Sequence, residues 1–138
     1  LFIGLAALQT VACADDKPIA LKDLPAAAQQ FLKQYFPDVK ATYAKVDNDL
    51  WGKNYDVLMA DGSSVEFDKN GNWTDVSCKA AQVPAAVIPQ AIRNHVAQQH
   101  PDQRIVSIDR DSKDYEVKLS NGVELKFDLK FNLIGFDD

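Results

Sequence analysis

Apolar and polar residues alternate along two stretches of the chain that resemble each other, residues 55–68 and residues 115–128. Each stretch alternates up to a turn pair, Asp61-Gly62 or Asn121-Gly122, and then resumes the alternation. This pattern is the strongest short-range signal for a β-hairpin closed by a tight turn with positive φ angles. We therefore predict two equivalent hairpins, each with one apolar and one mostly charged face. The apolar faces are Tyr55, Val57, Met59, Val65 and Phe67, and then Tyr115, Val117, Leu119, Leu125 and Phe127.

A helical pattern precedes each hairpin. Pro25 suits a first helical turn and Pro37 prevents the helix from continuing, so a helix is predicted between them. Its apolar stripe has the spacing of one helix face and consists of Ala28, Phe31, Leu32, Tyr35 and Phe36. A second helix is predicted after Ile88-Pro89, with the stripe Ile92, His95, Val96, Gln99 and His100.

Four further strands are predicted at residues 41–46, 73–78, 105–109 and 133–136, and residues 47–54 are predicted as a polar loop with Leu50 and Trp51 at its tip. The order of one helix and four strands thus occurs twice. We predict an α+β fold of two tandem α-β-β-β-β repeats, residues 15–80 and 81–138, in antiparallel meander sheets with helices on one face and the other face open. Because units of about 60 residues are marginal alone, the two repeats are expected to form one compact domain.

The first fourteen residues differ from the rest, because they are almost wholly apolar and too short to span a bilayer. We interpret residues 1–14 as the end of a signal peptide, with cleavage before Asp15 and no transmembrane segment in the mature chain. One alternative is a lipoprotein signal with Cys13 as the acylated residue, and another is a buried N-terminal segment. A periplasmic or secreted protein is expected, in which Cys78 is a small buried side chain rather than a reactive thiol.

The composition argues against some classes of partner, and the sequence contains few motifs that indicate catalysis or cofactor binding. The 138 residues carry a formal net charge of −5 without a lysine-arginine cluster, which argues against nucleic acid or an anionic membrane as partner. No nucleophile motif and no phosphate-binding glycine loop is found, so neither an enzyme nor a cofactor is expected. The acidic side chains Glu66, Asp68, Glu116, Glu124 and Asp128 are interpreted as a solvated face.

Two features of the sequence are candidates for a metal site. His95 and His100 do not converge on one helix face, and both replace aromatic residues of the first helix, so they are interpreted as partly buried structural side chains. Residues 68–72 resemble the opening of a calcium loop but lack the glutamate that an EF-hand requires, and a hairpin turn explains them equally. No metal ligand is predicted.

The open sheet face differs between the two repeats. The first repeat offers Tyr43, Leu58, Ser64 and Glu66, with Leu50 and Trp51 on the nearby loop, whereas the second offers Ser107, Lys118, Glu124 and Lys126. Exposed aromatic and aliphatic residues are typical of a protein-binding hot spot. The candidate partner-binding residues are therefore Tyr43, Leu50, Trp51, Leu58 and Glu66. Alternatively, Trp51 folds back onto the sheet and covers Leu58.

Several segments together resemble a known family: Leu-Pro-Ala-Ala-Ala-Gln-Gln-Phe at 24–31, Tyr-Phe-Pro-Asp at 35–38, Tyr-Asp-Val at 55–57 and Phe-Asp-Lys-Asn-Gly-Asn-Trp at 67–73. The chain is similar to the beta-lactamase-inhibitor-like, PepSY-like proteins of bacterial periplasms. The resemblance implies the fold of beta-lactamase inhibitor protein, in which a concave sheet and loops hold an enzyme. It assigns no contact residue here, and the mature chain lacks the inhibitor's paired cysteines.

From the sequence we expect a non-catalytic binding module that holds an unidentified protein or peptide on its open sheet face. The alternative is a periplasmic protein that binds a small ligand or a cation through its acidic face and turns. The oligomeric state does not follow from the sequence.

Overall fold

The structure is a computed structural model that describes residues 16–50 and 52–138. The signal peptide predicted for residues 1–14, the alternative acylation of Cys13 and the predicted contact residue Trp51 lie outside the described residues. The alternative of a buried N-terminal segment and residue 15, the predicted start of the first repeat, also lie outside them.

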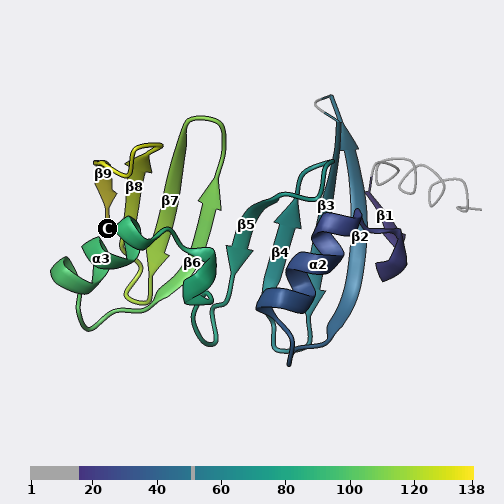
Figure 1. The fold of residues 1–138 in the computed structure, drawn as a ribbon, viewed down its shortest axis with the longest axis horizontal. Helices are drawn as coiled ribbons and strands as arrows, with labels where there is room; N and C mark the ends of the chain where they lie inside the picture. Colours follow the sequence, from purple (N-terminus) through teal and green to yellow (C-terminus); the bar gives the residue numbers. More distant parts are fainter. Residues whose placement is uncertain (1–15, 51) are drawn as a thin grey trace, which may run out of the picture.

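In the described residues, nine antiparallel strands form one continuous sheet in which each strand pairs with its neighbours in sequence (Figure 1). The sequence leaves open whether the strands form one sheet or two, and the structure has one. The strands are β1 (Asp16–Ile19), β2 (Ala41–Asp49), β3 (Gly52–Met59), β4 (Ser64–Phe67), β5 (Trp73–Ser77), β6 (Ile105–Arg110), β7 (Asp114–Leu119), β8 (Glu124–Asp128) and β9 (Leu133–Asp137).

Two α-helices, α2 (Ala26–Tyr35) and α3 (Gln90–Gln99), pack on the same face of this sheet. Phe31 of α2 meets Phe67 of β4 edge-on at 5.5 Å between ring centroids, and His95 of α3 meets Phe127 of β8 in the same way at 5.3 Å. Short 3-10 helices, η1 (Leu21–Asp23) and η2 (Ala85–Val87), precede them. The predicted class, an α+β meander with helices on one face, is confirmed.

The core is a row of apolar side chains that crosses the strands on the helix-covered face. Direct cross-strand pairing aligns Val57, Val65, Val76, Ile108, Val117 and Leu125, and each is at most 1% exposed. Burial of such a side chain stabilises a fold by about 1.5–3 kcal/mol. Because Val76 pairs with Ile108 across β5 and β6, the row passes without interruption from the first half of the chain to the second.

Three details of the sequence prediction were wrong. The four residues of β1 were not predicted as a strand, because an exposed edge strand containing Pro18 has no apolar alternation. The predicted loop 47–54 is mostly the extended end of a hairpin, since β2 continues to Asp49 and β3 begins at Gly52. In the turn after β3 only Gly62 has a positive φ, +90°, and Met59 pairs with Ser63, which makes a three-residue loop.

The turn between β4 and β5 packs against the first turn of helix α2. Gly71 has a φ of +87°, and a Cβ atom placed on it would lie 2.9 Å from the backbone nitrogen of Ala28. The corresponding turn of the second half has Phe131 at this position, with a φ of +69°, and its ring packs on Tyr115. The first turn therefore requires glycine for two reasons, its conformation and its contact with the helix.

We predict that Gly71→Ala destabilises the protein more than Gly62→Ala. Both substitutions force alanine into a left-handed conformation, which costs about 1–2 kcal/mol, but only the first also pushes a methyl group into α2. Gly62 has open space around it and is the matched control. Urea denaturation of both variants measures the difference, and equal losses in the free energy of unfolding would contradict close packing of this turn.

Candidate functional site

A row of charged side chains crosses the open face of the sheet. Direct pairing places side by side Lys45, Asp56, Glu66, Asp75, Asp109, Glu116 and Lys126, one from each strand from β2 to β8. The five carboxylates between the two lysines, Asp56 to Glu116, are called the acidic row. Side chains at directly paired positions are typically about 4.5–5.5 Å apart at their Cβ atoms.

The acidic row is the reverse side of the apolar core row. Each of its members is adjacent in sequence to a buried core residue, as Asp56 is to Val57 and Asp109 is to Ile108. Successive side chains of a strand point to opposite faces, so alignment of the core residues also aligns the carboxylates. The same pairing that closes the core therefore brings five like charges together.

Partial burial and mutual repulsion raise the pKa values of the central carboxylates. Burial is the largest cause for Glu66, followed by the charge of Asp56 and a hydrogen bond with it, and together they raise the pKa from 4.5 to about 7. Burial and then the charges of Glu116 and Asp75 raise the pKa of Asp109 to about 6. The pKa of Asp75 is also raised, by burial and by the charge of Asp56. Near neutral pH the row therefore holds protons that isolated carboxylates would have lost.

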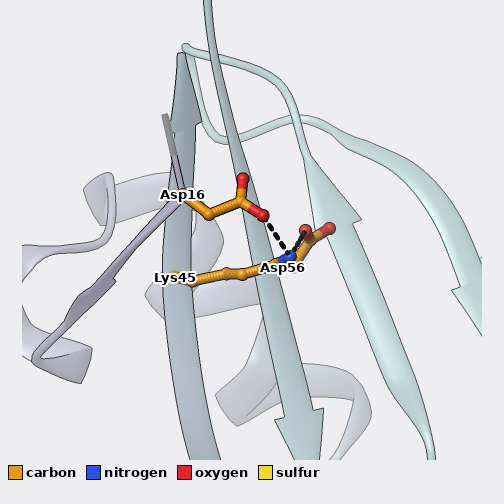
Figure 2. A network of polar contacts seen from close by, with 3 residues as sticks. All are labelled: Asp16, Lys45 and Asp56. Atoms are coloured by element: carbon orange, nitrogen blue, oxygen red, sulfur yellow. Dashed lines mark hydrogen bonds and ion pairs between the residues drawn. The ribbon is translucent and has the colours of Figure 1, made fainter. Parts of the chain in front are cut away.

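A lysine partly neutralises one end of the row (Figure 2). The Nζ atom of Lys45 lies 3.2 Å from Oδ2 of Asp16 and 3.7 Å from Oδ2 of Asp56. The hydrogen bond to Asp16 is the main reason that the pKa of Lys45 is raised. This contact also joins β1 to the open face, although ion pairs this exposed typically stabilise a fold by less than about 1 kcal/mol.

Two hollows follow the acidic row on the open face. One has a volume of about 490 Å³ and is lined by Tyr43, Leu58, Glu66 and Asp75, among others. The second, of about 290 Å³, lies farther along the row between Asp75, Glu116 and Lys126. The first hollow joins apolar and acidic walls, whereas the second is mainly polar.

The structure brings together three of the residues predicted as contacts. Tyr43 and Leu58 are direct partners in β2 and β3, each is 45% exposed, and both line the first hollow with Glu66. Leu50 is 95% exposed but follows the far end of β2, away from Tyr43 near its start. The structure therefore does not bring Leu50 to the hollow.

The histidines and Cys78 have structural surroundings. His95 packs edge-on against Phe127 and His100 stacks on Phe136, so both are partly buried aromatic neighbours as predicted. Cys78 is 2% exposed, and burial raises the pKa of its thiol, which confirms the prediction of a buried side chain. In the part of the chain that the structure describes, no three His, Cys, Asp or Glu side chains are placed to hold a metal ion.

The calcium-like sequence at residues 68–72 folds as a turn. One carboxylate oxygen of Asp68 accepts hydrogen bonds from the backbone N–H groups of Asn70 and Asn72, both at 2.9 Å. Asp128 caps the equivalent turn in the same way, and the bond from the N–H of Asn132 is the main reason that its pKa is lowered. This pattern is an Asx turn, which favours the hairpin interpretation.

The acidic row was missed in the sequence, although part of its signal was present. The Asp-Gly and Asn-Gly turns fix the hairpin partners, so Asp56 opposite Glu66 and Glu116 opposite Lys126 follow from the turn positions. The pairing of Asp75 with Asp109 has no such signal, because a long segment with helix α3 separates the two strands.

We predict that Glu66→Gln raises the melting temperature at pH 8 and flattens its dependence on pH. A carboxyl whose pKa is raised on folding stabilises the protein at low pH, and that stability is lost as the pH rises through about 7. Thermal unfolding between pH 5 and pH 8 measures the effect. Asp102→Asn, an exposed substitution outside the row, is the control. An unchanged pH dependence in Glu66→Gln would show that folding does not raise the pKa of Glu66.

Comparisons with known proteins place this arrangement in a family. A family model described as "Putative beta-lactamase-inhibitor-like, PepSY-like" matches residues 53–135, more than half of the chain. A comparison with curated proteins finds no match.

Solved structures from two Bacteroides species are similar over most of their length. A putative periplasmic protein of the DUF2874 family from Bacteroides vulgatus is 52% identical, with a TM-score of 0.87 over 90% of this chain and 98% of its own. A putative calcium-regulated periplasmic protein from Bacteroides thetaiotaomicron is 53% identical, with a TM-score of 0.89 and coverages of 91% and 99%. A third, a putative periplasmic protein of unknown function from Bacteroides vulgatus, is 34% identical with a TM-score of 0.85, covering 89% and 99%.

Neither α-helix of the described chain, at ten residues each, has the length and apolar character needed to cross a membrane. The protein is periplasmic, in agreement with its solved relatives, which are described as putative periplasmic proteins. By its sequence and its fold, this chain belongs to the beta-lactamase-inhibitor-like, PepSY-like family.

Proposed function

We propose that this chain is a non-catalytic binding module that holds a protein or peptide against the open face of its sheet. The observation that carries the proposal is the acidic row beside the exposed pair Tyr43 and Leu58. The helices cover only the other face, so this surface is free to meet a partner over most of the sheet (Figure 1). The inhibitor-like description of the family supports the same type of function.

Because the row consists of carboxylates, we expect the bound segment of the partner to be basic. Burial, followed by the negative charges of neighbouring carboxylates, raises the pKa values of Glu66, Asp75 and Asp109. A Lys or Arg side chain laid along the row would relieve this repulsion and would displace the retained protons. Complementary charge of this kind gives an interface specificity and rapid association.

An apolar contact next to the row would supply affinity. Tyr43 and Leu58 form one wall of the larger hollow, and Glu66 and Asp75 form another. Buried aromatic and apolar anchors surrounded by polar contacts are the usual composition of a binding hot spot. We therefore expect the bound segment to carry an apolar side chain close to its basic ones.

Both halves of the chain contribute to the proposed surface. The element order α2-β2-β3-β4-β5 is followed by α3-β6-β7-β8-β9, which supports interpreting the chain as a tandem repeat. Asp56, Glu66 and Asp75 come from the first half, and Asp109 and Glu116 from the second. On this interpretation duplication lengthened the binding surface across one sheet.

We predict that Asp75→Asn with Asp109→Asn reduces capture of the partner by about tenfold, and that added salt weakens capture by the wild type. Tyr43→Ser with Leu58→Ser should reduce capture without the same salt effect. The measurement is affinity capture from native periplasm with quantitative mass spectrometry, followed by titration of the purified partner.

Gln30→Ser with Gln34→Ser, two exposed substitutions on helix α2, is the matched control. Partner binding that survives both open-face variants, at unchanged melting temperatures, would contradict the proposal.

A cation-binding protein is the second candidate, and a specific observation favours it. One solved relative is described as a putative calcium-regulated periplasmic protein, and carboxylate oxygens are the ligands that Ca²⁺ prefers. Among the described residues no preformed group of three ligands exists. A calcium ion bound at the acidic row would therefore have to draw carboxylates of neighbouring strands closer together.

For this candidate we predict that millimolar CaCl₂ raises the melting temperature at pH 7.5 by several degrees and that Asp75→Asn with Asp109→Asn abolishes the shift. MgCl₂ serves as the control, because Mg²⁺ demands a more regular ligand geometry. A calcium shift lost only in Asp68→Asn would place the ion at the turn instead. No shift with calcium would eliminate this candidate.

A further inference from the structure

A separate hollow lies on the helix-covered side of the sheet, between α2, η1 and the ends of strands β2 and β3. Its volume is about 450 Å³, within the range of roughly 300–1,000 Å³ that is usual for small-molecule sites. We call it the α2 hollow. Its apolar lining consists mainly of Leu21, Leu24, Leu32, Phe36, Val39 and Met59.

Two lysines stand at this apolar lining. Lys22 of η1 and Lys33 of α2 both line the hollow, and both are exposed. In the described chain neither side chain is part of an ion pair. Asp23, next to Lys22, is not among the lining residues, and its carboxylate accepts a hydrogen bond from the backbone N–H of Ala20. The walls therefore carry positive charge beside an apolar floor.

The second half of the chain contains an equivalent hollow that is partly filled. It lies between η2, α3 and β6, and its volume is about 230 Å³, roughly half that of the α2 hollow. Arg93 stands at the position of Gln29, Gln103 at that of Val39, and Ala97 at that of Lys33.

Side chains of the second hollow also bind its own backbone. The Nε–H of Arg93 donates to the carbonyl of Ile88 at 3.1 Å, as the side-chain amide of Gln29 does to the carbonyl of Leu24 at 2.8 Å in the first half. The Nε–H of Arg104 donates in addition to the carbonyl of Ala81 at 3.2 Å. Longer polar side chains, Arg93 and Gln103, thus occupy part of the hollow in the second half. In the first half it remains larger and more apolar, and it carries the two lysines.

We propose that the α2 hollow binds a single-chain amphiphile with an anionic head group, of the chemical class of a fatty acid. The alkyl chain lies along Leu24, Leu32 and Met59, where each buried methylene group adds to the affinity. The carboxylate head lies between the ammonium groups of Lys22 and Lys33, at the solvent side of the hollow. This site is independent of the acidic row, which occupies the opposite face of the sheet.

The test is a titration of the isotope-labelled full chain with decanoate and, in parallel, with 1-decanol, followed by amide chemical shifts. Decanoate should bind saturably, with the largest shifts at residues of the α2 hollow. Lys22→Glu with Lys33→Glu should weaken decanoate binding about tenfold and leave decanol binding within about twofold. Gln29→Arg with Val39→Gln, which copies the second half, should weaken binding of both ligands.

Lys79→Glu with Lys130→Glu, two exposed lysines outside the hollow, is the matched charge control and should change neither affinity. Melting temperatures confirm that each variant is folded. Absence of saturable binding, shifts centred on the open face, or decanoate binding that is insensitive to the lysine reversals would each overturn the proposal.

Discussion

The pairing of β5 with β6 is the interaction on which the rest of the structure depends. It joins Val76 to Ile108 on one face of the sheet and Asp75 to Asp109 on the other. Without it, each half would be a small helix-backed meander of only marginal stability. With it, one core extends under both helices. Backbone hydrogen bonds beyond the paired residues, from Cys78 to Val106 and from Val83 to Ile105, prolong the junction.

The same junction creates the electrostatic character of the open face. Three carboxylates from one half and two from the other would be separate, ordinary clusters if the halves were apart. With the halves joined, Asp109 of the second half lies beside Asp75 of the first, and burial together with the charges of Glu116 and Asp75 raises the pKa of Asp109 to about 6. Burial of the apolar row on the opposite face of the same strands offsets the free-energy cost of this repulsion. A cationic ligand bound at the row would reduce this repulsion. For this reason we propose a function for the open face rather than a merely solvated role.

The sequence predicts the parts of the fold whose signals are local. Alternation and the Asp-Gly and Asn-Gly turns were sufficient for the hairpins, and the apolar stripes and prolines for the helices. The edge strand β1 was missed because it has no apolar alternation, and backbone pairing with β2 is what holds it in the sheet. The central part of the acidic row was also missed, since the register of β5 against β6 depends on how two cores meet. The α2 hollow depends on how side chains of separate elements, such as Leu24, Val39 and Met59, pack together, which local patterns do not describe.

Each strand of the sheet pairs only with the strands next to it in sequence. Contacts between near neighbours along the chain have a small loop-closure cost, and proteins dominated by them fold quickly. A chain that enters the periplasm from its N-terminus could therefore add one strand after another to a growing sheet. The strand order is compatible with folding during export, because each strand pairs with the strand that enters the periplasm just before it and the one that enters just after it.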